Sequence, residues 1–296
     1  MRSEPSKPAA RGRASARFLG LMGTIILCGC ASTKIPTTTL TQSDPEAMSL
    51  VTASQRAQGA GAFATIRDLK VSYAGKWSAI GPRLQPVLSD RRYRRESEEA
   101  LDLTNGTIVQ LHTGPGGRKF VFRGPGRVSV SYNGQTDANE DVIRSAALVA
   151  DAYKMFLLGP HYFQRPGVIL EKLEPGKVGS AEVDRVLATL RPGFGFADED
   201  RVVLSIDKGT QRLRRVLMTL HGLESAKGAE VDVTFDRWIE RSGVWWATDY
   251  DERIRSPLKL HAHRWRLMDL KANKGFTPNQ PELLGEAVSE ALKRAQ

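Results

Sequence analysis

The chain has two cysteines, Cys28 and Cys30, whose thiols are its strongest candidate nucleophiles. They come at the end of an uncharged, mostly apolar run of ten residues, 18–27. The segment before that run carries five basic side chains and one acidic side chain. A positive segment followed by a short apolar segment is typical of a secretory signal. The run is too short to be a stable membrane span, which takes about 20 residues as a helix.

The residues Leu27-Cys28-Gly29-Cys30 resemble the lipobox of bacterial lipoproteins. In that family the thiol of the last cysteine receives a diacylglyceryl group, cleavage makes this cysteine the first residue, and its amine is then acylated. The resemblance implies that residues 1–29 are a lipoprotein signal peptide and that lipid on Cys30 holds the chain at a membrane. Two lipid chains or more matter because a single chain binds a bilayer only marginally. The alternative is a chance Gly-Cys beside an apolar run.

The residue after Cys30 bears on which membrane holds the protein. In the best-known sorting rule of bacterial lipoproteins, an Asp at this position retains the protein in the inner membrane. Ala31 stands there instead. The resemblance therefore implies the outer membrane, on its periplasmic face.

Loss of residues 1–29 and acylation of Cys30 would leave the folded body without a free thiol. The body would then have no disulfide, no thiolate nucleophile and no cysteine-ligated metal. The formal net charge would fall from +10 to +6, because residues 1–29 hold five basic side chains and one acidic one. A mild positive charge favours anionic surfaces but is not by itself a nucleic-acid footprint. We predict no nucleic-acid partner.

His261 and His263 form a second group with chemical potential. Alternate residues of a strand point to the same side, so the two imidazoles would lie together. With Asp249 or Asp251 from a neighbouring strand they form a candidate metal site. No third ligand follows at a recognisable spacing, and pairs of surface histidines are common. The interpretation that we favour is that no metal binds.

The run Arg91-Arg92-Tyr93-Arg94-Arg95 combines four basic side chains with an aromatic one. It could contact anionic lipid headgroups, at about 1 kcal/mol for each basic residue near the surface. It could instead solvate an edge strand, where charge prevents unwanted strand pairing. We favour the edge strand over the headgroup contact. RNA binding is a third interpretation, which export makes less favourable.

The Gly-rich segments 114–117 and 124–126 do not open a helix, as a phosphate-binding loop must, and they are typical of turns. The sequence has no GxSxG or GxGxxG motif. No nucleophile and base stand in a recognisable arrangement. We therefore predict a protein that is not an enzyme and that holds no cofactor.

The elements that would position these residues are helices and antiparallel strands. Residues 30–43 include a Ser/Thr-rich stretch without an apolar period, which predicts a flexible tether. Asp44-Pro45-Glu46 is typical of a helix start, and we expect this helix to end near residue 58. Apolar residues at 142, 146, 149, 153 and 156 predict a second helix, and Pro281 begins a final helix within 276–296. Turn signals between alternating runs predict antiparallel sheet around the second helix.

The segment 201–254 resembles the outer-membrane lipoprotein-sorting superfamily of LolA and LolB. In it a strand ends in Asp236-Arg237-Trp238, a Gly turn follows, and the next strand opens with Trp245-Trp246. The resemblance extends less specifically over residues 45–275, and it leaves an insertion near 160–200 and a tail past 275. It implies an α+β fold over residues 44–275: a strongly curved antiparallel sheet, or half-open β-barrel, with helices packed in the concave face.

The same resemblance implies an apolar cavity for acyl chains between the sheet and the helices. Nine residues of the predicted strands are candidates for lining it, with ordinary core as the alternative for each: Val71, Tyr73, Phe122, Val130, Val216, Met218, Val233, Phe235 and Trp246. The leading hypothesis is a membrane-anchored envelope lipoprotein that binds an acyl chain or a lipidated partner. The alternative hypothesis is a structural or interaction subunit of an envelope complex, with a filled core and no ligand.

Overall fold

The computed structural model describes residues 34–257 and 259–276. Contacts divide the chain into two units, Met1–Thr33 and Lys34–Gln296, and the description concerns the second unit. The predicted signal peptide, the predicted lipidation site Cys30 and the predicted final helix from Pro281 lie outside the described residues. These features stay predictions, as do the domain boundaries near residues 43 and 275.

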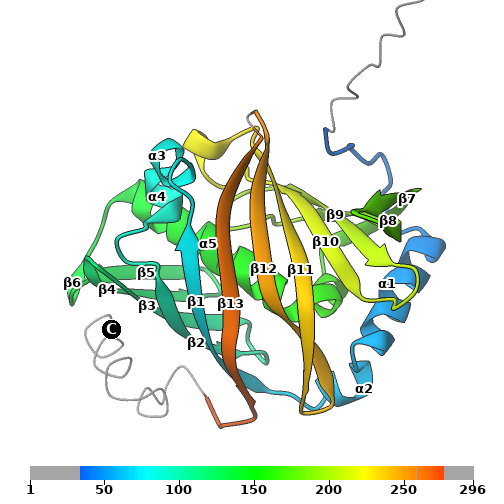
Figure 1. Ribbon diagram of the computed structural model, residues 1–296, viewed down its shortest axis with the longest axis horizontal. Helices are drawn as coiled ribbons and strands as arrows, with labels where there is room; N and C mark the ends of the chain where they lie inside the picture. The colour runs from blue at the N-terminus through cyan, green and yellow to red at the C-terminus, as the bar shows by residue number, and fades with distance from the viewer. Residues whose placement is uncertain (1–33, 258, 277–296) are drawn as a thin grey trace, which may run out of the picture. The chain divides into compact units, whose positions relative to one another are not determined.

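The described part of the chain forms one antiparallel sheet of 13 strands (Figure 1). In spatial order the first half contains β6 (Gln135–Thr136), β5 (Arg127–Tyr132), β4 (Gly117–Gly124), β3 (Thr107–Gly114), β2 (Glu96–Asp102) and β1 (Asp68–Trp77). The order continues with β13 (Leu260–Ala272), β12 (Val244–Ser256), β11 (Glu230–Arg241), β10 (Leu213–Thr219), β9 (Asp200–Asp207), β8 (Ala181–Leu190) and β7 (Val168–Val178). Strands β6 and β7 form the two edges, so the sheet is not closed.

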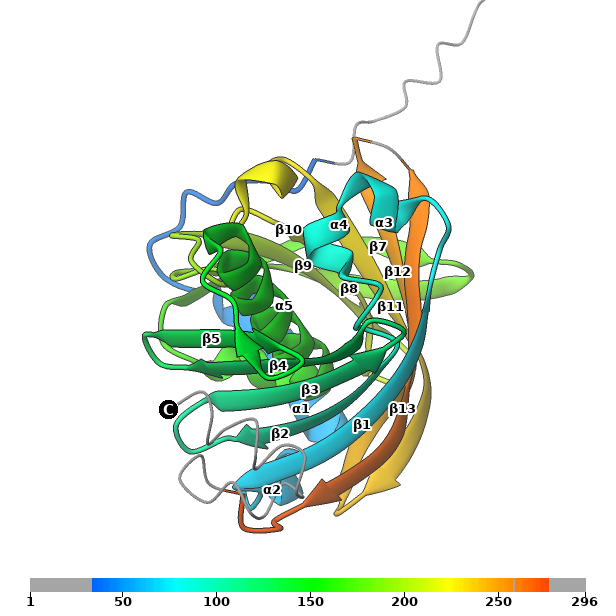
Figure 2. The same cartoon turned by 90° about the vertical axis from the view of Figure 1, so that its left-hand side faces the viewer.

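Helix α5 (Glu140–Leu158) lies on the concave side of the curved sheet (Figure 2). It follows β6 and leads through a 3-10 helix, η1 (Gly159–Gln164), to β7, so it connects the two sheet edges. The Asn139 side chain caps its first turn by accepting a hydrogen bond from the Val142 N–H at 3.2 Å. The predicted second helix is confirmed. The predicted fold, a curved antiparallel sheet with helices in its concave face, is confirmed as well.

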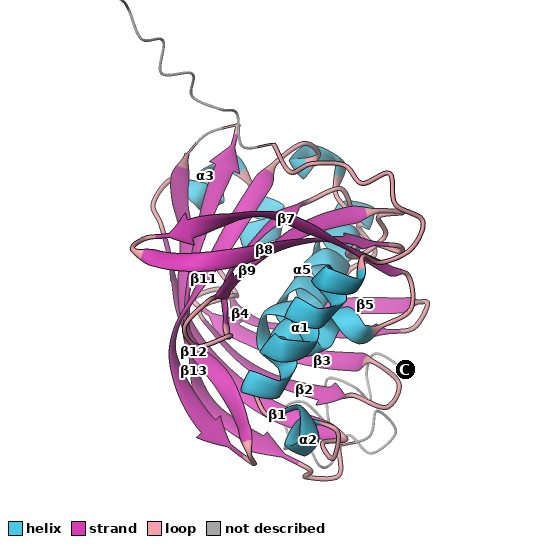
Figure 3. Cartoon of the chain, turned by 90° about the vertical axis from the view of Figure 1, so that its right-hand side faces the viewer, coloured by secondary structure: helices cyan, strands magenta, loops and turns pink. Residues whose placement is uncertain are grey.

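The first predicted helix is α1 (Pro45–Ala57), which is also confirmed. The Asp44 carboxylate accepts a hydrogen bond from the Glu46 N–H at 2.9 Å, and Pro45 stands at the first helical position. Figure 3 shows α1 beside α5, near β7 and β8, with the short helix α2 (Ala60–Phe63) after it. Two further one-turn helices, α3 (Gly81–Leu84) and α4 (Pro86–Ser89), connect β1 to β2. They pack against β13 and α5 respectively.

The core lies between the inner face of the sheet and the helices. Along β1, Leu69, Val71 and Tyr73 are buried, whereas the intervening Lys70 and Ser72 are partly exposed. This alternation is expected for a sheet with one covered face. Burying one such large apolar side chain contributes roughly 1.5–3 kcal/mol to the stability of the fold. The helices that cover these side chains are therefore held mainly by apolar contact.

Two segments differ from the predicted elements. The basic run 91–95 forms a turn before β2, and β2 lies between β1 and β3 instead of at an edge. The edge-strand interpretation of this run is therefore wrong, because long-range pairing decided the strand order. The segment near 160–200 forms η1 and the hairpin of β7 and β8, which extends the sheet by two strands.

Candidate functional site

A cavity of about 90 Å³ lies between α5, the α3–α4 pair and the inner face of the sheet. One side is closed by α3 and α4, through Gly81, Gln85 and Leu88. The other walls are mostly apolar and come from α5 and from five strands, β1, β10, β11, β12 and β13. Among their apolar residues are Leu148, Val149, Ala152, Phe156, Met218, Val231 and Ile254. Such a lining excludes water and favours apolar ligands.

Most of the predicted lining residues lie on the inner face of the sheet. Seven belong to the main buried core: Val71, Tyr73, Val216, Met218, Val233, Phe235 and Trp246. Val130 packs nearby with Val121 and with Ala146 of α5. Among these residues Met218 also lines the 90 Å³ cavity, and the others fill space around it. Their contact with a lipid stays a prediction.

Phe122 is the predicted lining residue that the structure places elsewhere. On β4, Val121 packs against α5, and Phe122 points to the opposite, convex face. There it packs in an apolar cluster with Phe120 and Phe276. Phe120 and Phe122 are both apolar, so the sequence of β4 alone does not show which face is inside; the pairing with β3 and β5 decides it.

Arg94 is the cationic residue of the cavity wall. It is 6% exposed, whereas its neighbours Arg92 and Arg95 are exposed to solvent. Its Nη1 donates a hydrogen bond to the Leu88 carbonyl oxygen of α4 at 2.6 Å. The guanidinium carbon lies 5.2 Å from the centre of the Trp77 ring and 5.1 Å from that of Tyr153. These are cation–π distances.

Two glutamates accompany Arg94 inside the sheet. Glu252 of β12 lines the cavity, and Glu99 of β2 is buried beside Gln110, with the Ser97 hydroxyl donating to its Oε1 at 2.8 Å. Burial raises the pKa of each carboxyl to about 7, although the positive charge of Arg94 acts to lower both values. At neutral pH each carboxyl is therefore only partly ionised.

Two histidines complete the interior polar cluster. Burial lowers the pKa of both His112 and His263 well below the usual value, and the charge of Arg94 lowers both further. The His263 ring stacks on Trp77 with its centre 4.0 Å away, and its Nδ1 lies 3.3 Å from the Tyr153 hydroxyl. Gly75 makes room for this ring, because a Cβ there would lie 2.4 Å from His263 Nε2. Both histidines are neutral at pH 7.

The candidate metal site does not assemble. A register shift between β12 and β13 separates the two imidazoles. Nε2 of His261 lies 3.3 Å from an Asp251 oxygen, while His263 is buried among aromatic rings. Among the described residues no group of three or more potential ligands is placed to hold a metal ion.

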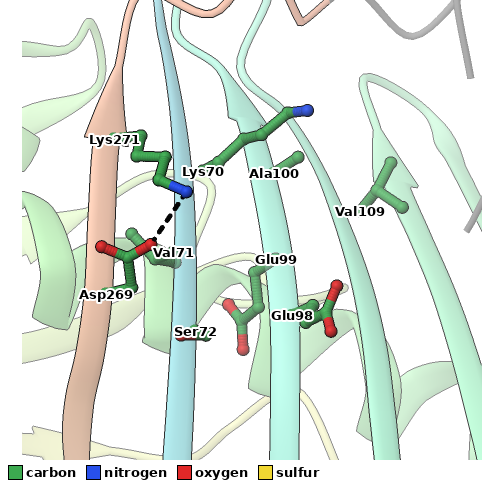
Figure 4. A pocket seen from close by; sticks show the side chains of 9 residues that line it. All are labelled: Lys70, Val71, Ser72, Glu98, Glu99, Ala100, Val109, Asp269 and Lys271. Atoms are coloured by element: carbon green, nitrogen blue, oxygen red, sulfur yellow. Dashed lines mark ion pairs between the residues drawn. The ribbon is translucent and has the colours of Figure 1, made fainter. Parts of the chain in front are cut away.

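Two other hollows hold charged side chains in their walls. One of about 300 Å³ lies across β13, β1 and β2 on the convex face (Figure 4). Charged side chains such as Glu98 line it, together with the ion pair of Lys271 with Asp269 at 3.2 Å. Another, of about 390 Å³, lies beside the end of α5 and holds Asp151 paired with Arg123 at 2.9 Å. In both hollows charged side chains interrupt the apolar surface, which disfavours an acyl chain there.

Sequence reasoning missed the polar residues of the cavity. Arg94 belongs to a run of arginines, and nothing in that run distinguishes the one that points inward. Glu252 stands between Asp251 and Arg253 in a segment that looks solvent-facing. The apolar residues of α5 could be predicted in part, because the helical period places Val149 and Phe156 on one stripe.

No family model matches the sequence, and no curated protein does either. Several solved structures are similar to the chain. A LolA superfamily protein from Nitrosomonas europaea is similar with a TM-score of 0.51 at 10% identity, over 79% of this chain and 96% of that one. A DUF1329 family protein from Desulfovibrio piger gives 0.48 at 11% identity, over 79% and 96%. The Mycobacterium tuberculosis lipoprotein LppX gives 0.28 at 10% identity, over 79% and 99%.

The first of these similarities defines the class of fold. The chain has a LolA-like fold, as the resemblance of segment 201–254 implied. At an identity of 10%, this similarity shows a shared fold and nothing further. Within the described residues, no helix is both long and apolar enough to cross a membrane.

Proposed function

We propose that the protein is a bacterial envelope lipoprotein, held at the periplasmic face of the outer membrane through Cys30, that binds an acyl chain or a lipidated partner inside its half-barrel. The observation that carries the proposal is the apolar cavity between α5 and the sheet. It lies on the concave side of a LolA-like fold, where buried apolar side chains surround it. Apolar burial, at about 0.8 kcal/mol for each CH₂ group, would provide the binding energy without a covalent step.

Binding requires that α3 and α4 move. The cavity of about 90 Å³ is smaller than the ~300–1,000 Å³ of most ligand sites. Each of the two helices has four residues, and helices of one turn have little stability of their own. Few hydrogen bonds hold the pair, among them Ser145 Oγ to the Val87 carbonyl at 3.0 Å. Displacing them would widen the cavity enough to admit a chain.

A structural or interaction subunit is the second candidate function. The observation in its favour is the size of the cavity, since large side chains such as Trp246, Tyr250 and Phe235 already fill most of the concave side. In this case an outer surface would contact an envelope protein, and no lipid would enter.

Native mass spectrometry of the full chain, released from detergent micelles, distinguishes the two functions. We expect a noncovalently bound lipid on the wild type and much less on Ala152→Leu, which adds volume to the cavity wall. Ala181→Leu, at the partly exposed start of β8, is the matched control and should keep its lipid. If no lipid co-purifies and none can be loaded, acyl binding is refuted and the structural subunit stands.

A further inference from the structure

The charge of Arg94 is poorly compensated by the protein. Arg94 lines the cavity, is almost fully buried and forms no ion pair with any described residue. Burying a charge is costly unless it is paired and hydrogen-bonded. One carbonyl oxygen and two aromatic faces provide partial compensation. Within residues 34–257 and 259–276, no carboxylate lies at ion-pairing distance from Arg94.

The nearby carboxyls do not supply that charge. Both Glu99 and Glu252 interact with Arg94 electrostatically, yet neither is within ion-pairing distance of it. Their burial favours the protonated form up to about neutral pH. The other acid near this cluster, Asp90, is already occupied by Lys119 at 2.7 Å and by the Tyr132 hydroxyl at 2.7 Å. An anion brought by a ligand would therefore find a cation without a competing internal partner.

We infer that the ligand is a single acyl chain ending in a carboxylate, a free fatty acid, whose carboxylate binds Arg94. A planar guanidinium matches a carboxylate through two parallel N–H···O hydrogen bonds, and such charge-assisted bonds strengthen where water is excluded. The chain would extend from Arg94 along Ala152 and Phe156 of α5 towards Met218, all in the wall of the same cavity. The small volume favours one chain over several. This inference rests on the proposed acyl binding and adds the head group that selects the ligand.

Photocrosslinking in membranes tests the inference on the full lipidated chain. The probe is a palmitate analogue that carries a diazirine in its chain, and labelled peptides from α5 report entry into the cavity. Unlabelled palmitate should compete at least about tenfold better than hexadecanol, which has the same chain without the charge. Arg94→Met should lower labelling of α5 by about tenfold or more. Arg92→Met, which removes an exposed arginine two residues away, should stay within about twofold of the wild type.

The outcomes separate the head-group inference from acyl binding itself. If hexadecanol competes as well as palmitate, or if a folded Arg94→Met chain is labelled like the wild type, the carboxylate inference fails and acyl binding stands. If neither palmitate nor a diazirine analogue of hexadecanol labels α5, both fail. Circular dichroism reports whether Arg94→Met folds. Should it not fold, the competition on the wild type decides, and Arg94→Lys, which keeps the charge, should still prefer palmitate.

Discussion

Glu99 illustrates, at the scale of one residue, how the half-barrel accommodates an acid. Its side chain points into the concave side from β2, whereas Glu98 beside it points to solvent. Burial raises the pKa of Glu99 to about 7, and the hydrogen bond from Ser97, with the charge of Arg94, limits the rise. An acid whose pKa is raised by folding favours the folded state most at low pH, where it is protonated in both the folded and the unfolded state. That stability is lost as the pH rises from the unfolded value near 4.5 through the folded value near 7.

Glu99→Gln should remove this pH dependence. Between pH 4.5 and pH 8 the stability of the variant relative to the wild type should increase by a few kcal/mol, because each pKa unit corresponds to about 1.4 kcal/mol. Urea unfolding at the two pH values measures the difference. The contribution of Glu252 is present in both chains and cancels. Glu98→Gln, on the exposed side of the same strand, should show no such change; parallel pH profiles for Glu99→Gln and the wild type would contradict the prediction.

At the scale of the elements, the α3–α4 pair decides whether a ligand can enter. It connects β1 to β2 and covers the cavity. Gln85, between the two helices, contacts the loop that precedes β11: its Nε2 donates to the Ser225 carbonyl oxygen at 2.6 Å, and the Ser225 hydroxyl donates to its Oε1 at 3.3 Å. This contact connects the cover to the far rim of the cavity. A covalent bond there would keep the cover closed.

We predict that a reducible crosslink between Gln85→Cys and Ser225→Cys, made with a short bis-methanethiosulfonate reagent, prevents acyl binding. Gln85 reaches Ser225 through the end of its side chain, so the reagent supplies the length that two cysteines lack. The crosslinked protein should label on α5 at least about tenfold less than its reduced form with a photoreactive acyl probe, since an immobile cover closes the entry. Each single cysteine variant treated with the same reagent should label like the reduced double variant. Equal labelling of the crosslinked and reduced forms would show that the chain enters elsewhere.

At the scale of the whole molecule, the body binds its own N-terminal segment. Ile35 is buried against Leu187 and Val203 on the convex side of β8 and β9. The Ile35 backbone N–H donates to Glu230 Oε1 at 2.7 Å, and Arg201 Nη1 donates to the Ile35 carbonyl oxygen at 2.9 Å. Residues 31–34 alone separate this contact from Cys30, and five residue steps reach roughly 17 Å at most. A lipid on Cys30 would therefore hold the body close to the bilayer.

The two neighbouring cysteines allow a matched test of the proposed anchor. Cys30→Ala should prevent lipid attachment and move most of the protein from the membrane to the soluble fraction, because no acyl chain then holds it. Cys28→Ala should be processed and remain membrane-bound, since Cys28 lies before the proposed cleavage site. Fractionation and intact mass measure both effects. Maturation and membrane attachment of Cys30→Ala as in the wild type would refute the anchor.

The sequence by itself determined the elements, since their causes are local. Asp44 with Pro45 and the apolar stripe of 140–158 define α1 and α5, and the turn signals define most of the hairpins. Three features depended on pairing between distant strands: the face of β4 that carries Phe122, the place of β2 inside the sheet and the inward position of Arg94. Only the tertiary structure decided them. A strand buries the face that α5 and the neighbouring strands cover, and the sequence of one strand does not show which strands will be its neighbours.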